Sequence, residues 1–525
     1  MPRWLALAAL PMLTLAGCGG SKPQGTVRSA PLISIFEAPL QLATAPGPTL
    51  NLLHRLGVDD VRVILPWSRI APDATSHKVP AGLAGASPAA YPEVNWAPYD
   101  AIIRAAAARK MGVLLNVSGP APLWASARGA PPGAEPGVWK PSATQFRLFV
   151  HAVGVRYSGH YKPPSGGGAL PRVSFWSIWN EPNLGEANLA PQAIDNSTVE
   201  SSAQMYRELL DAGWSSLQAT GHGQDTILIG ELAPYGQTGP GDPGNFGEMA
   251  PLRFLRALYC VDSSLQPLRG AAAAERGCPT TAAASKSFAT KHPALFQASG
   301  FAMHPYANLE TAPPSLVLPD EPDFVYLATL SRLESFLDTV TKVDGAGRQF
   351  PIYSTEFGYF TKPPSPSAPS LALAAEYINQ SEYMSWRMPR LRSWDQYLLA
   401  DPQTGGPSAF NSGLEYSSGQ PKPIVFDAWR MPLFLPATRE QKGHGLEVWG
   451  DVRPIHYTPR PQDVRIQLEP GGHGGFETVQ TVSVSDRGGY FDTSVKFPSS
   501  GEVRLTWTYP HGPTIHSRLV TISVD

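Results

Sequence analysis

The sequence carries little charge and almost no excess of either sign. Only 16% of its 525 residues are charged, and the formal net charge is −2. Proteins that bind nucleic acid or acidic surfaces usually carry a clear basic excess. We therefore expect no nucleic-acid partner, and the low charged fraction is lean for a cytosolic protein.

Two further signals are missing. His, Cys and Asp do not occur together at the spacings typical of metal sites. No Gly-rich phosphate-binding turn follows the first strand-like segment, residues 31–37. We expect neither a metal nor an organic cofactor, and the second absence disfavours a doubly wound nucleotide-binding sheet.

The chain has only three cysteines, and the first lies in a targeting segment. Arg3 precedes an apolar run, Trp4 to Leu15, which is too short to cross a bilayer comfortably. The run ends in Leu15-Ala16-Gly17-Cys18, which resembles the bacterial lipobox. That resemblance implies a signal peptide over residues 1–18 and lipidation of Cys18, the alternative being an ordinary secretory signal with a chance cysteine. Either way we expect an exported protein, lipid-anchored at the cell surface or extracellular, whose contact with the membrane is the anchor alone.

The other two cysteines, Cys260 and Cys278, lie in a loop-like insertion. Neither has His or Cys partners at metal spacing. In an oxidising compartment two nearby cysteines favour a local disulfide over two free thiols. We expect this pair to close a loop and assign it no role in catalysis.

Between residues 30 and 435, short apolar segments alternate with amphipathic ones. Eight segments are strand-like, namely 31–37, 60–66, 112–118, 173–180, 226–231, 299–304, 350–356 and 391–398. Helical spacing of apolar residues marks the segments between them, such as 98–110, 143–157, 202–219, 323–341 and 371–386. Eight strands in alternation with helices predict a (β/α)8 TIM barrel. The 49 glycines and 55 prolines indicate long loops.

The tail, residues 440–525, has a different pattern. Apolar and polar residues alternate at period two in six short segments separated by Gly, Pro and Asp. This predicts a small C-terminal antiparallel β-sandwich. It either binds carbohydrate or braces the barrel, and its few aromatic residues favour bracing.

Two glutamates follow strand-like segments in similar surroundings. Glu181 ends FWSIWNE, and Glu356 ends PIYSTE. A polar residue after a strand is usually the start of a solvated loop, but in a TIM barrel the functional groups gather at these strand ends. The fourth and seventh strands lie on roughly opposite sides of the barrel mouth, so the two carboxyl groups face each other. Such a pair suits cleavage of a glycosidic bond, in which one group donates a proton and the other meets the sugar carbon.

The two motifs resemble those of a known group of enzymes. Trp179-Asn180-Glu181-Pro182-Asn183 resembles the acid/base motif of clan A glycoside hydrolases, as in families 5 and 39, and Ser354-Thr355-Glu356-Phe357-Gly358 resembles the nucleophile strand of the same clan. The resemblance implies that Glu181 is the general acid/base and Glu356 the nucleophile of a retaining enzyme. It also implies that Asn180 binds the sugar 2-hydroxyl, a contact that strengthens at the transition state.

By the same resemblance, three residues surround the nucleophile. Arg62 matches the second-strand arginine beneath it, and a buried cation there would keep Glu356 ionised. His304 and Tyr306 match the sixth-strand pair, in which the tyrosine hydroxyl bonds the nucleophile. A structural ion pair for Arg62 and a core position for His304 are the alternatives.

Three tryptophans are candidates for sugar contacts. Trp394 falls where the clan often keeps an aromatic platform, while Trp67 and Trp124 follow the second and third strands and could line subsites. Packing in the core is the alternative for each. The rival carboxylates Glu37, Glu231 and Asp395 also lie near strand ends, but they lack the Asn-Glu-Pro context.

The sequence thus predicts a retaining β-glycosidase that acts on a polysaccharide or its oligosaccharides, with a carbohydrate substrate and a monomeric chain. A transglycosylase on the same scaffold and a non-catalytic glycan-binding surface protein are the alternatives. The loops that follow Asn183 and residue 232 match no pattern of the clan, so the sugar, the linkage and endo or exo action stay open.

Overall fold

A computed structural model describes residues 31–238, 243–307, 311–343, 347–406 and 409–525 of the chain. The predicted signal segment 1–18 and the predicted lipidation site Cys18 lie outside these ranges. Among the described helices, none has both the length and the apolar composition needed to cross a membrane.

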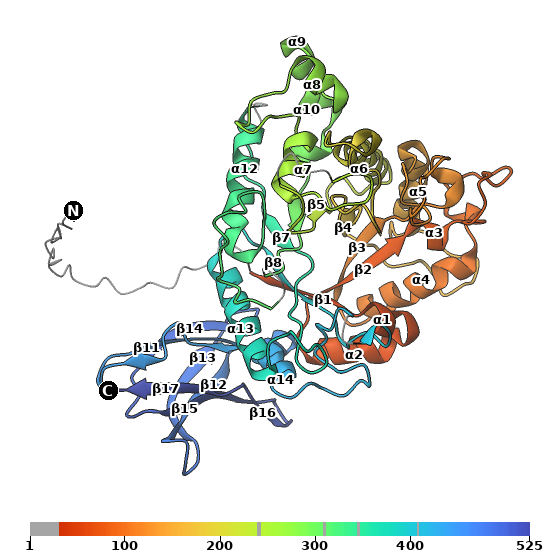
Figure 1. Cartoon of the computed structure of the whole chain (residues 1–525). Coiled ribbons are helices and arrows are strands. Elements are labelled where there is room, and N and C mark those ends of the chain that lie inside the picture. Colours follow the sequence, from red (N-terminus) through yellow and green to blue (C-terminus); the bar gives the residue numbers. More distant parts are fainter. Residues whose placement is uncertain (1–30, 239–242, 308–310, 344–346, 407–408) are drawn as a thin grey trace, which may run out of the picture.

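Eight parallel strands form the central barrel (Figure 1), in the order β7-β6-β5-β4-β3-β2-β1-β8. They are β1 (Ile33–Glu37), β2 (Asp60–Pro66), β3 (Gly112–Ser118), β4 (Phe175–Ile178), β5 (Thr226–Leu232), β6 (Gly300–Met303), β7 (Ile352–Ser354) and β8 (Ser393–Tyr397). Between β7 and β8, Ile352 N donates to Arg390 O (2.9 Å) and Arg392 N donates to Ile352 O (2.8 Å). The predicted (β/α)8 barrel is confirmed, and each strand overlaps its predicted range.

Helices cover the outside of the barrel (Figure 1). The principal ones are α2 (Pro46–Arg55), α4 (Glu93–Ala107), α5 (Ala143–Arg156), α6 (Ser202–Ala219), α7 (Pro251–Leu258), α12 (Leu330–Val343), α13 (Leu371–Arg387) and α14 (Val425–Arg430). In α12 the predicted apolar face is buried, but the helix starts at Leu330 and not at residue 323. A preceding 3-10 turn, Leu327–Thr329, is held by the bond from Tyr326 N to Thr329 Oγ1 (3.1 Å), which competes with an earlier helical start.

The interior of the barrel changes from apolar to polar along its axis. Near the middle of the strands, Ile35, Leu114, Leu228 and Ala302 form a fully buried apolar cluster. Toward the C-terminal ends follow eight polar residues, none more than 2% exposed: Glu37, Arg62, Asn116, Ser177, Glu231, His304, Thr355 and Asp395. Buried polar groups are expensive unless they are paired, so this layer is the part of the core that stability alone does not explain.

The connection between β5 and β6 carries an extra helical insertion. It holds α7 and four short helices, α8 (Gly270–Glu275), α9 (Ala282–Ser285), α10 (Phe288–Lys291) and α11 (Ala294–Gln297). Cys260 and Cys278 form a disulfide within it, with an S–S distance of 2.06 Å. The predicted pairing is confirmed.

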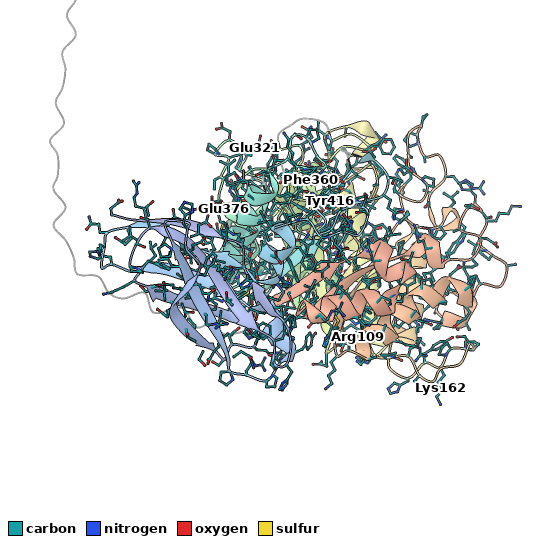
Figure 2. All side chains as sticks on the ribbon, turned by 90° about the horizontal axis from the view of Figure 1, so that it is seen from below. Arg109, Lys162, Glu321, Phe360, Glu376 and Tyr416 are labelled. Atoms are coloured by element: carbon teal, nitrogen blue, oxygen red, sulfur yellow. A yellow bond between two sulfur atoms is a disulfide. The ribbon has the colours of Figure 1, made fainter. Side chains whose placement is uncertain are left out.

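The C-terminal region forms two packed sheets beside the barrel (Figures 1 and 2). One contains β10 (Arg439–Glu440), β12 (Gln462–Pro470), β13 (Glu477–Val484), β15 (Gly501–Thr508), β16 (Thr514–His516) and β17 (Val520–Val524); the other contains β9 (Leu433–Phe434), β11 (Leu446–Asp451) and β14 (Tyr490–Val495). The strands are antiparallel except for β10 and β17. The predicted sandwich is confirmed, and it takes up β9 from before residue 435.

A buried ion pair joins the sandwich to the barrel. Arg453 donates to both carboxylate oxygens of Glu382 on α13 (2.8 and 2.7 Å), and its guanidinium lies 4.2 Å from the ring centroid of Trp429. Tyr490 of β14 donates to the same carboxylate (2.8 Å). This contact favours a bracing role for the sandwich.

Candidate active site

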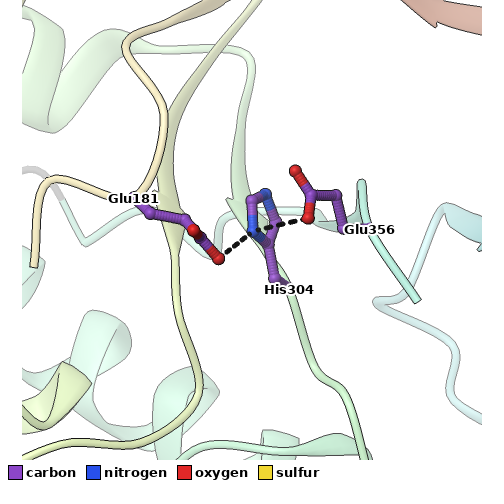
Figure 3. A group of neighbouring side chains, drawn as sticks. All are labelled: Glu181, His304 and Glu356. Carbon is purple, nitrogen blue, oxygen red and sulfur yellow. Dashed lines mark hydrogen bonds and ion pairs between the residues drawn. The ribbon is translucent and has the colours of Figure 1, made fainter. Parts of the chain in front are cut away.

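Glu181 and Glu356 meet at the C-terminal mouth of the barrel (Figure 3). Glu181 lies just beyond β4 in a left-handed backbone conformation, with φ of 40°, and its N–H donates to the backbone oxygen of Glu231 (2.9 Å). Glu356 follows β7. His304, just beyond β6, lies between them. One ring nitrogen of His304 and one carboxylate oxygen of each glutamate lie within 4.8 Å of one another. The side chains of Glu181 and Glu356 are 18% and 9% exposed, so Glu181 is the more accessible carboxylate.

Glu356 is held by three polar neighbours. Arg62 donates to Oε1 (2.7 Å) and Tyr306 donates its hydroxyl hydrogen to Oε2 (3.1 Å). Nδ1 of His304 lies 3.5 Å from the same Oε2. Burial raises the pKa of Glu356, and the positive charges of His304 and Arg62 offset part of this rise.

Arg62 is the central cation of the polar layer, and its side chain is fully buried. Besides Glu356 it donates to Glu37 (2.8 Å), to Glu231 (3.0 Å) and to Oδ1 of Asn180 (2.6 Å). Although burial alone would lower its pKa, the surrounding carboxylates raise the pKa well above the usual value. One fixed positive charge therefore holds groups from four barrel strands or the loops that follow them.

His304 is fully buried and joins the two glutamates to the layer below. Its Nδ1 lies 2.8 Å from Glu181 Oε1, and its Nε2 lies 2.7 Å from Glu231 Oε2. Burial opposes the charged form, but Glu356, Glu181 and Glu231 outweigh it and raise the pKa of His304 to about 10. At neutral pH both ring nitrogens thus carry a hydrogen and both donate to carboxylates.

The other buried carboxyl groups divide into one that is ionised and two that are neutral. Burial alone would raise the pKa of Glu231, but Arg62 and His304 outweigh this effect and lower the pKa to about 2. Burial raises the pKa of Glu37 to about 8 and that of Asp395 well above its usual range. All three lack the Asn-Glu-Pro context that marks a reacting carboxylate in the sequence, yet the fold brings them into the network around Arg62 and His304.

The structure does not bring the predicted tryptophans to the mouth. Trp394 is 1% exposed, and its ring stacks on Trp429 with a centroid distance of 6.4 Å. The proposed sugar platform at Trp394 is therefore wrong, because the ring packs outside the barrel against α14. Trp67 is 0% exposed and stacks on Phe149, and Trp124 is 8% exposed, with its N–H bound to Pro72 O (2.9 Å). Burial leaves neither ring a face for a subsite.

Tyr397 is the aromatic residue of β8 that faces the site. Tyr397 is partly exposed. Burial raises the pKa of its hydroxyl group well above the usual value, and the nearby Glu356, Glu37 and Glu181 act in the same direction. Period-two alternation places Tyr397 on the same face of β8 as Asp395 and places Trp394 on the other face. That parity was a usable signal in the sequence.

The loop after β4 supports the more exposed glutamate. Asn188 donates to Glu181 Oε2 (3.4 Å) from this loop. The loop pairs on one side with the loop after β3, through the Trp139–Ala190 bridge. On its other side, Gly185 N donates to Gly247 O (3.0 Å) in the loop after β5. The loops after β4 and β5, which match no pattern of the clan, thus join with the loop after β3 into one hydrogen-bonded unit that contacts Glu181.

The three donor atoms of Glu181, His304 and Glu356 are close enough to consider a metal ion. However, Nδ1 of His304 is hydrogen-bonded to Glu181 and Nε2 to Glu231. Arg62 lies 2.7 Å from Glu356, so a cation would have to bind beside a fixed positive charge. The arrangement fits proton transfer and nucleophilic attack, and we do not identify these residues as metal ligands.

Neither a protein-family model nor a curated protein sequence matches the chain. Similar solved structures include a family 39 glycoside hydrolase of Bacteroides cellulosilyticus WH2, with a TM-score of 0.42, 14% identity, and coverage of 88% of this chain and 79% of that one. A family 1 β-glucosidase of Thermotoga maritima has a TM-score of 0.45 and 15% identity, with coverage of 74% of this chain and 85% of that one. An endo-β-1,4-mannanase of Thermotoga petrophila has a TM-score of 0.38 and 11% identity, with coverage of 94% of this chain and 97% of that one. At such low scores these likenesses add no argument to the one that the side chains provide.

Proposed function

We propose that the protein is a retaining β-glycosidase, with Glu356 as nucleophile and Glu181 as general acid/base. The observation that supports this most is the approach of the two carboxylates to within 4.8 Å across His304. Carboxyl groups of retaining enzymes stand roughly 5–5.5 Å apart, whereas inverting enzymes keep about 6.5–9.5 Å to admit a water molecule. The short distance between Glu181 and Glu356 thus favours direct attack of a carboxylate on the sugar over attack by a water molecule placed between them.

The different surroundings of the two glutamates support their roles. Glu356 is bound by a guanidinium and a phenol, which hold a nucleophile in one orientation. Glu181 is more exposed and so can meet the oxygen of a departing group. Since Glu356 is enclosed by Arg62 and Tyr306, the reverse assignment would put the proton donor at the less accessible position.

The reaction then proceeds in two displacements. Glu356 attacks the anomeric carbon, the bond from that carbon to the leaving oxygen breaks, and Glu181 gives its proton to that oxygen. The products are a glycosyl ester of Glu356, a released alcohol and an ionised Glu181. A water molecule then attacks the ester, gives a proton to Glu181 and releases the sugar, which returns Glu356 to its ionised form.

Two further residues have positions that suit sugar binding. Oδ1 of Asn180 is already bound to Arg62 (2.6 Å), so its NH2 group is the end of the amide left for a hydroxyl of the sugar. Tyr397 offers a partly exposed ring on the inner face of β8, and aromatic faces stack well on pyranoses. We propose a carbohydrate substrate and a monomeric enzyme, exported and lipid-anchored through Cys18.

The test uses aryl β-glycosides with Glu356→Ala, Glu181→Ala and the control Glu200→Gln. Glu200 is also a paired carboxylate, bound to Arg253 (2.8 Å) and Arg276 (2.7 Å), but outside the polar layer of the barrel. We expect both alanine variants to lose turnover and the control to keep it. Azide should rescue Glu356→Ala and give a glycosyl azide of inverted configuration. Full turnover by either folded alanine variant, or no azide product from folded Glu356→Ala, would refute the assignment.

A further inference from the structure

Glu231 contacts both halves of the candidate active site from the layer beneath it. Its Oε2 accepts hydrogen bonds from Arg62 Nη2 (3.0 Å), His304 Nε2 (2.7 Å) and Thr355 Oγ1 (2.7 Å). Its backbone oxygen accepts the N–H of Glu181 (2.9 Å). The residue is 0% exposed, so no part of the carboxylate reaches a substrate.

A β-bulge turns this carboxylate into the barrel. The register of β5 against β6 shifts between Gly230 and Leu232, and Glu231 itself has a left-handed backbone with φ of 50°. A bulge inserts one residue and redirects a side chain. Leu228 already faces the interior, so regular alternation would have placed Glu231 on the outer face with the apolar residues. The fold accepts a strained backbone and a buried charge at this position, which points to a role beyond packing.

The hydrogen bonds of His304 define what Glu231 does. One ring nitrogen faces Glu231 and the other faces Glu181, and the latter nitrogen is also 3.5 Å from Glu356. A neutral imidazole carries one hydrogen and can donate to only one carboxylate. With an ionised Glu231 on Nε2, a second hydrogen on Nδ1 makes His304 a cation that lies between the two glutamates (Figure 3).

We propose that Glu231 is a positioning residue that keeps His304 positively charged, so that the negative charge of the glutamate pair stays compensated on whichever glutamate carries it. This rests on the proposed function. In the first displacement the charge leaves Glu356, which becomes an ester, and arises on Glu181, which has lost its proton. In the second it returns. A cation within hydrogen-bonding or ion-pair distance of both oxygens needs no rearrangement during either step.

The charged and titratable groups that surround this histidine come from several elements. They are Glu37 on β1, Arg62 on β2, Glu181 after β4, Glu231 on β5 and Glu356 after β7. Of the carboxyl groups in this set, only Glu231 is both ionised and absent from the proposed chemistry. Its removal therefore tests the charge of His304 without removing a reacting group.

The first measurement follows the protonation of His304 by NMR of labelled histidine, assigned by comparison with His304→Gln. In the wild type we expect an imidazolium at pH 8. In Glu231→Gln the apparent pKa of the ring should fall by about 1–3 units, because an opposite charge at contact distance is lost. A neutral His304 in the wild type at pH 8 would overturn the proposal, whether or not any glycosidase activity is found.

The second measurement is the pH dependence of kcat/KM on an aryl glycoside. We expect Glu231→Gln to lose activity on the alkaline side in step with the titration of His304, and to lose roughly 10–100-fold at its optimum. Glu231→Asp, which keeps the charge, should recover part of the alkaline activity and part of the activity at the optimum. If activity in Glu231→Gln does not change as His304 loses its proton, the charge of His304 is not required and the proposal fails.

Glu382→Gln is the matched control. Glu382 is also 0% exposed and accepts hydrogen bonds from an arginine and a hydroxyl group, Arg453 and Tyr490, but at the sandwich interface. It should lower stability and leave the pH profile and the His304 titration unchanged. Should Glu231→Gln fail to fold, Glu231→Asp and the wild-type NMR titration still decide the question.

Discussion

The hydroxyl group of Tyr306 offers the most direct test of how the nucleophile is held. It donates to Glu356 Oε2 at 3.1 Å, and the ring packs on Phe357 and Phe410 with centroid distances of 6.2 and 5.3 Å. Tyr306→Phe removes the hydrogen bond and keeps these ring contacts, so the fold should survive. A hydrogen bond to a charged group contributes about 1.5–3 kcal/mol. At about 1.4 kcal/mol per tenfold change in rate, kcat/KM should fall roughly 10–100-fold.

The pH profile of Tyr306→Phe gives a second, independent readout. A donor to the ionised carboxylate lowers its pKa, so its loss should raise the pKa of Glu356 and move the acidic limb of kcat/KM to higher pH. Tyr91→Phe is the control, because the Tyr91 hydroxyl donates to the backbone oxygen of Gly85 (2.8 Å) in a buried position away from the polar layer. A folded Tyr306→Phe with activity within about twofold of the wild type and an unmoved acidic limb would refute this account of the site.

Three further predictions concern stability. Burial raises the folded-state pKa values of Glu37 and Asp60 to about 8 and about 7. Their contribution to the free energy of unfolding is therefore complete below about pH 4 and is lost as the pH rises through the folded values. Urea unfolding should show lower stability at pH 8.5 than at pH 5, with a smaller difference in Glu37→Gln. Arg453→Ala should lower the free energy of unfolding by about 3–5 kcal/mol, because it leaves the buried carboxylate of Glu382 without its cation, and a loss within the error of the urea titration would count against the bracing role. Replacing Cys260 and Cys278 by serine should cost about 3 kcal/mol for a sequence separation of 18 residues, and an unchanged melting temperature would contradict the entropic argument.

The barrel and its two principal glutamates could be predicted because their signals are local. Each strand is a short run of apolar residues, and each helix has a recognisable period, so the alternation could be counted along the chain. Glu181 and Glu356 directly follow two of these strands, and parallel strands bring their C-terminal ends to one side of the barrel. Location followed from topology, and no information about side-chain contacts was needed.

What failed were the predictions that depend on which way a side chain points. The resemblance to the clan predicts a platform at Trp394, but alternation along β8 gives the inner face to Asp395 and Tyr397. The inward direction of Glu231 could not be predicted either, because the bulge after Gly230 reverses the alternation at the next side chain. A bulge depends on pairing between strands, which no single segment of the sequence reveals.

The polar layer also shows what charge lies beneath the two glutamates. Its cations are Arg62 and His304, and Glu231 supplies one negative charge, while Glu37 and Asp395 are kept neutral. One further negative charge balances the layer. The reacting carboxyl groups of a retaining glycosidase carry one negative charge between them, and this layer places one compensating positive charge below the reacting atoms.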